Sequence, residues 1–200
     1  MSQPTFVPMS CGEPRFRIER LGPEHERTNF RCSRESALEE YLCNNERALR
    51  ENRRDIAAVY LLLDADEGGR IAGYYTLSSA SVVPRDIPKQ IASKLPRYPQ
   101  WPVTRLGRMA RHDGYAGQGL GPILIARAFE SALIVAASVA TFALIVDAKN
   151  DALCSWYASL GFQSCVDQAR TLFIVNETIR AYLQAIEAAS VSTFEKTVRE

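Results

Sequence analysis

The stretch Trp101–Ala128, WPVTRLGRMARHDGYAGQGLGPILIARA, predicts a strand, a glycine-rich loop and a helix in direct succession, and this succession decides the fold. Val103–Ala110 has the apolar and small residues of an extended segment, and a turn at Asp113-Gly114 leads into Gly117-Gln118-Gly119-Leu120-Gly121. The apolar run that follows predicts a helix with Pro122 in its first turn, where the missing N–H of a proline costs no hydrogen bond.

A glycine loop that opens a helix is suited to holding an anion. The first N–H groups of a helix have no intrahelical partners, and the helix end carries about half a positive charge. The spacing G-x-G-x-G lacks both the G-x-G-x-x-G rhythm and the later acidic residue of a dinucleotide fold, and no Gly-Lys-Ser/Thr follows as in a triphosphate loop. The loop is therefore a site for another phosphate compound or only a tight connection.

A second motif begins about 40 residues after the first one. Thr141–Val146 is a short apolar and β-branched run, which predicts a buried strand. Asp147–Asp151 is a polar turn, and Ala152–Leu160 predicts a short helix that ends with Gly161 at its C-cap. The second motif is thus again a strand, a turn and a helix.

Both motifs resemble those of the GNAT superfamily of N-acetyltransferases. Ala116–Gly121 is similar to its pyrophosphate loop, Arg/Gln-x-x-Gly-x-Gly/Ala, and Asn150–Phe162 is similar to its segment N-x-x-A-x-x-x-Y-x-x-x-G-F. Two motifs in the right order are more specific than either alone. The resemblance implies an α+β (α/β) acyl-CoA N-acyltransferase fold, in which a central mixed, mostly antiparallel sheet is flanked by helices and splayed at its central strands.

The resemblance also implies a site that uses acetyl-CoA as co-substrate and no metal. It places the acetyl-pantetheine arm along Met109, Ala110 and Arg111, and the coenzyme sulfur beside Tyr157, which would donate a proton to the departing thiolate. The remaining coenzyme contacts fall on Ala116, Gly117, Gln118, Gly119, Leu120, Gly121 and Asn150. Ala116 departs from the family pattern, because it cannot make the side-chain contact of Arg or Gln. For Tyr157, a core aromatic residue is the alternative to a catalytic one.

A wider likeness is to the acetyltransferase toxins of type II toxin-antitoxin modules, and it covers Phe16–Asn176. Trp156-Tyr157, Gly161-Phe162 and Arg170–Phe173 are similar to the F-Y, G-F and R-T-L-F of those toxins. The likeness implies acetylation of the α-amino group of aminoacyl-tRNA, which inhibits translation. It also implies a ribbon-helix-helix antitoxin and a homodimer. The sequence has no signal-peptide pattern and no uncharged run of membrane length, so we expect a cytoplasmic protein.

The segment Arg85–Arg111 is cationic, with seven basic residues against the single acid Asp86. Basic side chains neutralise phosphates and aromatic rings stack on unpaired bases. The aromatic residues interleaved with the basic ones are Tyr98 and Trp101. From the segment we select five residues as expected tRNA or substrate contacts: Lys89, Lys94, Arg97, Trp101 and Arg108. The alternative is a solvated helix face with arginines beside the phosphates of the coenzyme.

The first third of the chain predicts a strand, a helix and a hairpin. The strand is Phe16–Leu21, and Ser36–Glu39 has the pattern of a capping box. The helix that follows has Leu38, Tyr41, Leu42 and Leu49 on one face, and the hairpin consists of Ile56–Leu63 and Ile71–Leu77. We divide the chain into a flexible N-terminal arm (1–14), a GNAT acetyltransferase domain (15–176), and a C-terminal amphipathic helix and tail (177–200).

Composition excludes several classes of protein. The chain has 200 residues, 46% of them hydrophobic, and a formal net charge of +1, as in an ordinary globular protein of one domain. The longest uncharged run, Ser131–Val146, is shorter than a membrane span, and the N-terminus lacks the pattern of a signal peptide. Five cysteines without a C-x-x-C pair predict neither a disulfide framework nor a zinc site. We expect His112 at the surface end of the central strand.

No general base is evident in the sequence, and this favours one class of acceptor. A lysine amine has a pKa near 10.4 and needs a base, whereas an α-amine has a pKa near 7.7 to 8.0 and is partly neutral already. Aminoacyl-tRNA and a protein N-terminus both fit this condition. Two other functions stay open: acetylation of a small amine, and a co-repressor of low turnover that acts with an antitoxin.

Overall fold

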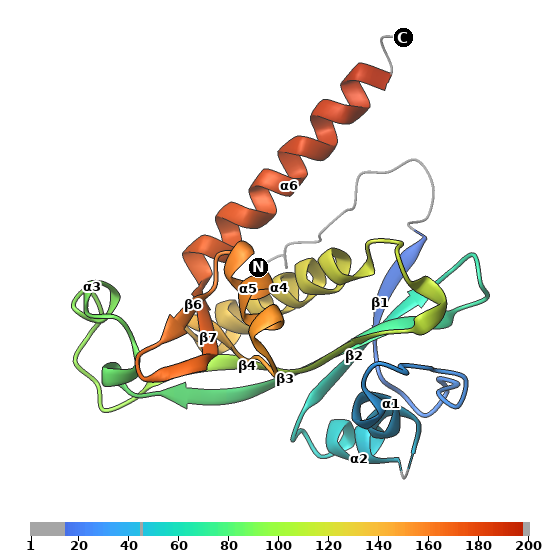
Figure 1. Ribbon diagram of the computed structural model, residues 1–200, viewed down its shortest axis with the longest axis horizontal. Coiled ribbons are helices and arrows are strands. Elements are labelled where there is room, and N and C mark those ends of the chain that lie inside the picture. Colours follow the sequence, from blue (N-terminus) through green and yellow to red (C-terminus); the bar gives the residue numbers. More distant parts are fainter. Residues whose placement is uncertain (1–14, 45, 198–200) are drawn as a thin grey trace.

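The computed structural model describes residues 15–44 and 46–197 (Figure 1). Their core is a seven-stranded sheet in the order β1-β2-β3-β4-β5-β7-β6. All neighbouring strands are antiparallel except β4 and β5, which are parallel. The predicted central mixed, mostly antiparallel sheet is therefore confirmed.

The elements follow the predicted order. The strands are β1 (Phe16–Arg20), β2 (Ala58–Asp64), β3 (Arg70–Val82), β4 (Trp101–Arg111), β5 (Ala143–Asp147), β6 (Gln163–Cys165) and β7 (Gln168–Val175). The helices are α1 (Ser36–Cys43), α2 (Arg47–Arg53), α3 (Lys89–Ala92), α4 (Leu120–Val139), α5 (Asp151–Ser159) and α6 (Asn176–Thr197), with single 3-10 turns η1 (Pro84–Asp86) and η2 (Asp113–Tyr115). The predicted arm 1–14 lies outside the described residues, and α6 begins one residue before the predicted boundary.

Helices cover both faces of the sheet (Figure 1). Side chains alternate along a strand, so Leu144 and Val146 of β5 pack under α4 and α6. Ile145 packs on the opposite face against residues 87–100, which contain α3 and are called the α3 segment. On that opposite face α1 and α2 bury the β2 residues Val59 and Leu61. The result is one core on the α4 side and two smaller cores on the other.

By length and composition, helix α4 could cross a membrane. The search for the longest uncharged run in the sequence did not find this helix, because α4 contains the charged residues Arg127 and Glu130. Its residues Leu124, Ile125 and Phe129 are fully buried against the sheet, and Phe129 also contacts Tyr182 of α6 with ring centroids 5.4 Å apart. The core helix of a folded domain passes the same test of length and composition, so α4 is weak evidence for a membrane span.

The predicted capping box is wrong. The chain forms two helices where one was expected, and the N-cap of α1 is Glu35, which makes no side-chain capping bond. Glu39 instead accepts a hydrogen bond from the N–H of Cys32, at 2.7 Å. The Glu39 carboxylate, which a capping box would need, is thus bonded to the loop before α1. Ser36 is the first residue of the helix and not its N-cap.

The two central strands separate partway along their length, as predicted. Strand β4 pairs with β5 only from Thr104 to Leu106. On its other side, β4 pairs with β3 through a register shift that places Gly107 and Arg108 together opposite Thr76. A bulge of this kind bends a strand. Beyond Leu106, the backbone of β4 therefore has no strand partner on the β5 side among the residues that the structure describes.

Candidate active site

A cavity of about 710 Å³ lies where β4 leaves β5. Its walls come from β4, from the start of α1, from the turn between β5 and α5, and from α5 itself. Six residues predicted from sequence line it: Arg108, Met109, Ala110, Arg111, Asn150 and Tyr157. The fold thus gathers the predicted thioester and acceptor residues from two motifs about 40 residues apart in the chain.

Both ends of α5 are fixed by backbone hydrogen bonds, and this places Tyr157. At the start, the Asn150 side chain accepts a hydrogen bond from the N–H of Leu153 at 2.9 Å, so Asn150 is an N-cap. At the end, Gly161 has φ +94° and the N–H of Phe162 donates to the Tyr157 carbonyl at 3.2 Å. With the bond from the Gly161 N–H to the Ala158 carbonyl, this is a Schellman motif.

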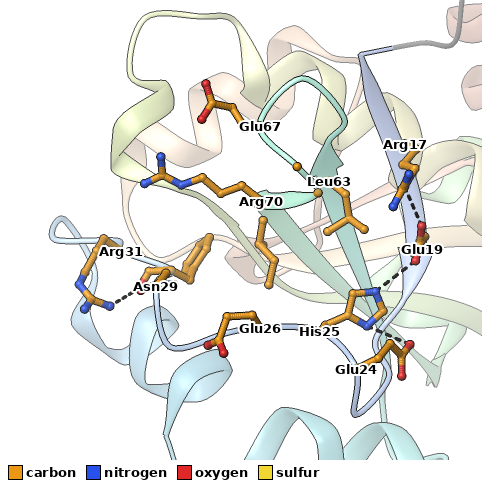
Figure 2. Close-up of a pocket in the computed structure, with 14 residues that line it drawn as sticks. Arg17, Glu19, Glu24, His25, Glu26, Asn29, Arg31, Leu63, Glu67 and Arg70 are labelled. Carbon is orange, nitrogen blue, oxygen red and sulfur yellow. Dashed lines mark hydrogen bonds and ion pairs between the residues drawn. The ribbon is translucent and has the colours of Figure 1, made fainter.

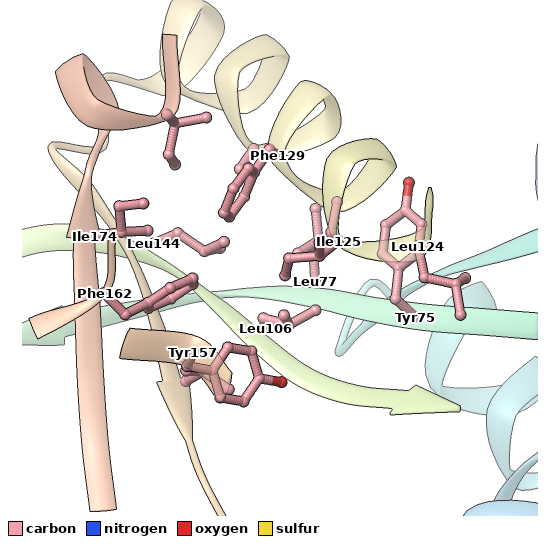
Figure 3. Close-up of a cluster of buried hydrophobic side chains, with 14 of the residues drawn as sticks. Tyr75, Leu77, Leu106, Leu124, Ile125, Phe129, Leu144, Tyr157, Phe162 and Ile174 are labelled. Atoms are coloured by element: carbon pink, nitrogen blue, oxygen red, sulfur yellow. The ribbon is translucent and has the colours of Figure 1, made fainter. Parts of the chain in front are cut away.

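The Tyr157 ring is buried, with 6% of the residue exposed, and its hydroxyl points away from Phe162 (Figure 3). Trp156 and Phe162 contact the ring edge-on at centroid distances of 4.9 and 5.1 Å. Burial raises the pKa of Tyr157 to about 12. The hydroxyl therefore keeps its proton at neutral pH and can act as a hydrogen-bond donor or a general acid.

The glycine loop at the start of α4 has the conformation of an anion cradle. Gly117 and Gly119 have φ +76° and +71°, which only glycine adopts readily, and the space where each would carry a Cβ atom is open. Gly119 is the N-cap of α4, and no side chain of the described residues caps the helix there. Leu120 anchors the loop in the core, and Ala116 is exposed. The loop itself does not line the cavity.

His112 connects the glycine loop to the segment before α1, and the expectation of a surface position is wrong. It is 3% exposed. Its Nδ1 accepts a hydrogen bond from the N–H of Gly114 at 2.9 Å, so Nε2 carries the hydrogen and donates to the carbonyl of Asn29 at 3.1 Å. A polar side chain that accepts a hydrogen bond from the backbone two residues later favours a local turn. The sequence His112-Asp113-Gly114 is compatible with such a turn, and this could have indicated the position of His112.

Each acidic residue that lines the cavity, among the residues described, already has a partner. Glu35 forms an ion pair with Lys149, which joins α1 to the turn before α5. Asp147 forms an ion pair with Arg105 and accepts a hydrogen bond from Thr171 at 2.8 Å. Asp113 accepts from the N–H of Ser33 at 2.8 Å, and hydrogen bonds from Ser33 lower the pKa of the Asp113 carboxyl. The site therefore offers no unengaged carboxylate as a base.

The structure divides the residues predicted to contact tRNA into two groups. Arg108 lies in the cavity, whereas Lys89, Lys94 and Arg97 lie around α3, near the opposite end of β4 (Figure 1). Trp101 cannot stack on a base, because it is 5% exposed and donates its indole N–H to the Pro96 carbonyl at 2.9 Å. That prediction is wrong, since the ring belongs to the core under α3.

An exposed aromatic side chain near α3 is Tyr98, which belongs to the cationic segment of the sequence but was not selected there as a tRNA contact. It is 60% exposed, and no hydrogen bond or ring contact of its side chain is found within the described part of the chain. Among the described residues, the side chains of Lys89, Lys94 and Arg97 form no ion pair. Within residues 15–44 and 46–197, the α3 segment thus combines three cations that form no ion pair with one aromatic ring that makes no side-chain contact of these kinds.

A second cavity, of about 790 Å³, lies between β1, the β2–β3 hairpin and the segment before α1 (Figure 2). Its charges largely satisfy one another: Glu19 forms ion pairs with Arg17 at 2.7 Å and with His25 at 3.1 Å, and His25 also faces Glu24 at 3.2 Å. None of the residues predicted to be functional lines it. We therefore place the candidate active site in the cavity beside Tyr157.

Comparison with known proteins agrees with this geometry. The tRNA-acetylating toxin of Mycobacterium tuberculosis is 27% identical over 164 residues, which cover 82% of this chain and 94% of that protein. The crystal structure of a tyrosine-to-phenylalanine mutant of KacT has a TM-score of 0.75 and 29% identity, and the match covers 84% of this chain and 99% of KacT. The structure of AtaT complexed with acetyl-methionyl-tRNAfMet has a TM-score of 0.74 and 29% identity, and the match covers 83% of this chain and 98% of the AtaT chain.

The family assignment rests on a match across most of the chain. Residues 24–162 match the model of the acetyltransferase (GNAT) family, and this range contains the separated central strands, the glycine loop and Tyr157. The chain therefore belongs to the GNAT family of acetyltransferases.

Proposed function

We propose that this protein is the toxin of a type II toxin-antitoxin system and transfers the acetyl group of acetyl-CoA to the α-amino group of aminoacyl-tRNA, which inhibits translation. The observation that carries the proposal is that the likeness to a tRNA-acetylating toxin spans 94% of the Mycobacterium tuberculosis protein. The match to the acetyltransferase family, residues 24–162, includes every residue that lines the cavity. The charges of the α3 segment and the lack of a free base in the cavity support the same substrate.

The glycine loop fits the pyrophosphate of acetyl-CoA. Gly117 and Gly119 leave open space where side chains would stand, and no side chain from residues 15–44 or 46–197 caps the first N–H groups of α4. A phosphate would accept hydrogen bonds from these N–H groups at the positive end of the helix. The related AtaTR complex has been solved with acetyl-CoA bound. Ala116 leaves this cradle without the side chain that the family pattern carries.

The separated strands would hold and polarise the thioester. In the described part of the chain, backbone groups of Met109–Arg111 that face away from β3 have no strand partner, so they can bond the pantetheine arm. One N–H there would donate to the thioester carbonyl, where negative charge develops as the amine attacks. Acetyl-CoA supplies the acyl group and the thiolate leaving group. In this arrangement, β4 acts on the carbonyl and α5 acts on the sulfur.

Tyr157 would complete the transfer as a general acid. The amine nitrogen forms a bond to the acetyl carbon, the carbon–sulfur bond breaks, and the Tyr157 hydroxyl gives its proton to sulfur. The nitrogen loses one proton as the amide forms, and this proton restores the tyrosine. A pKa of about 12 keeps Tyr157 protonated until the thiolate develops beside it.

The acceptor must bring an amine that is already partly neutral, because Glu35, Asp113 and Asp147 are all engaged. The α-amine of an aminoacyl ester meets this requirement, and a lysine side chain does not. The α3 segment supplies cations for the phosphates of a tRNA and an exposed Tyr98 ring for stacking. Both features favour aminoacyl-tRNA over a small amine.

We further propose a cytoplasmic homodimer that a ribbon-helix-helix antitoxin neutralises. Two relatives support the existence of an antitoxin partner: the KacTA complex has been solved with DNA, and AtaT has been solved bound to the C-terminus of its antitoxin AtaR. Translation takes place in the cytoplasm, which is where a toxin that acetylates aminoacyl-tRNA would act.

Replacement of Gly119 tests the coenzyme cradle. We expect Gly119→Ala to weaken acetyl-CoA binding about 5- to 30-fold, because a side chain at φ +71° costs about 1–2 kcal/mol and so reduces the population of the binding conformation. Gly68→Ala is the matched control, since Gly68 has φ +64° and equally open space but lies in the β2–β3 turn. Calorimetric titration with acetyl-CoA measures both. A Kd unchanged in Gly119→Ala would contradict the cradle.

Replacement of Tyr157 tests the general acid. We expect Tyr157→Phe to lower kcat about 100- to 10,000-fold and to restore the growth of cells that express the protein, while acetyl-CoA still binds. The control is Tyr60→Phe, because Tyr60 is also packed on an aromatic residue, Tyr75, at a centroid distance of 5.1 Å, but on β2. Equal toxicity of the wild type and Tyr157→Phe, with both folded by circular dichroism, would refute the assignment.

Charge reversal in the α3 segment tests the tRNA surface. We expect Lys89→Glu, Lys94→Glu and Arg97→Glu together to lower kcat/KM for aminoacyl-tRNA on the order of tenfold or more. The slope of log(kcat/KM) against log[salt] should become shallower by about one unit for each phosphate that the variant no longer neutralises. Acetyl-CoA affinity should stay within about twofold of the wild type.

The control for this experiment changes the net charge by the same amount elsewhere. Arg50, Arg53 and Arg54 are exposed on and after α2, so their joint reversal to Glu alters the same number of charges. If both triple variants lose tRNA acetylation equally, the loss is not specific to the α3 segment and the prediction of a distinct tRNA surface there is wrong.

A further inference from the structure

Arg108 has an unusual environment within the cavity. Its side chain is 30% exposed, and its guanidinium carbon lies 3.9 Å from the centroid of the Tyr41 ring. Its Nη1 is 3.7 Å from a carboxylate oxygen of Glu51, which is close enough for an ion pair and too far for a hydrogen bond. In residues 15–44 and 46–197, no acceptor takes a hydrogen bond from the guanidinium. Its five N–H donors are thus held in place and remain unused.

Tyr41 and Glu51 are themselves rigidly held. Tyr41 is 3% exposed, stacks on Tyr74 at a centroid distance of 6.1 Å, and donates its hydroxyl to Glu51 at 2.9 Å. The other carboxylate oxygen of Glu51 accepts from Arg47 at 3.0 Å. A ring below the guanidinium and a carboxylate beside it restrict both its tilt and its position. These contacts orient Arg108 before any ligand arrives.

Glu51 does not have the properties of a general base. Both of its oxygens are occupied, one by Arg47 and the other by Tyr41 with Arg108 beside it. Burial tends to raise the pKa of the Glu51 carboxyl, but the hydrogen bonds from Arg47 and Tyr41 and the charge of Arg108 outweigh it and lower that pKa. A carboxylate that binds a proton so weakly is suited to holding a cation.

We propose that Tyr41 and Glu51 are positioning residues that present Arg108 to a phosphate at the 3′ end of the aminoacyl-tRNA, the one on the 5′ side of the terminal nucleoside. This inference rests on the proposed function. Among ligand groups near the reacting amine, the phosphate is the one whose oxygens match the planar fork of an arginine, and it carries the complementary charge. Arg108 lies next to Met109, so this contact would fix the terminal nucleoside beside the thioester.

The test compares two minimal acceptors that differ in this phosphate alone. They are 3′-aminoacyl adenosine with and without a 5′-phosphate, carrying an amino acid that the wild-type enzyme acetylates on tRNA. We expect the wild type to prefer the phosphorylated acceptor, and Arg108→Gln to lower its kcat/KM about 10- to 100-fold through KM. The preference of the wild type for the phosphorylated acceptor, taken as the ratio of the two kcat/KM values, should fall toward one in Arg108→Gln.

Variants at Glu51 distinguish positioning from proton transfer. Glu51→Gln keeps the shape and removes the charge, so we expect a two- to fivefold rise in KM for the phosphorylated acceptor and an unchanged pH profile of kcat. Glu51→Asp should recover part of the loss. Glu40→Gln is the control, since Glu40 is exposed on α1 and no ion pair of its side chain is found among the described residues.

The outcomes separate the inference from the proposed function. If the wild type acetylates no aminoacyl-tRNA, the proposed function fails. If it does, and Arg108→Gln loses equal activity on both acceptors, Arg108 does not bind the phosphate and the inference is wrong. Loss of the acidic limb of the pH profile in Glu51→Gln would make Glu51 a base and would overturn its assignment as a positioning residue.

Discussion

The hydrogen bond from the Arg108 backbone N–H to the Thr76 hydroxyl, 2.9 Å long, secures the bulge on which the candidate site depends. Because Gly107 and Arg108 share one partner residue on β3, β4 bends and its parallel pairing with β5 stops at Leu106. A Cβ atom on Gly107 would lie only 3.0 Å from the Thr76 hydroxyl, so the close approach favours glycine. The cavity and the free backbone of β4 follow from this bend.

The same bulge explains how the two chemical tasks of the site are separated. It aims the Arg108 side chain at Tyr41 and Glu51, on the α2 side, while Met109 packs with the core on the α4 side. The glycine loop then opens α4 close to Trp156, whose ring lies 3.8 Å from the Cβ position of Gly121. In the proposed mechanism the coenzyme groups act from the α4 and α5 side, and the acceptor is held from the α2 side.

Much of this was predictable from sequence, because glycines and caps are local signals. The strand, loop and helix around Gly117–Gly121 and the end of α5 at Gly161 follow from backbone conformations that few other residues adopt. Which side chains are buried, and which residues they contact, was not predictable from such local signals. Trp101 looked like a stacking residue but fills the core under α3, and Glu51 carries no motif that links it to Arg108, 57 positions later. Such pairings depend on tertiary structure.

The central claim is that the acceptor is the α-amine of an aminoacyl-tRNA, and one measurement tests it most directly. Purified protein is incubated with radiolabelled acetyl-CoA and either charged tRNA or the same tRNA after deacylation, and nuclease-sensitive, alkali-labile label is counted. We predict label on the charged pool alone, and sorting by tRNA then identifies the amino acid. No label on either pool, together with acetylation of small amines or peptides, would contradict the claim and would leave the α3 cations as a solvated surface.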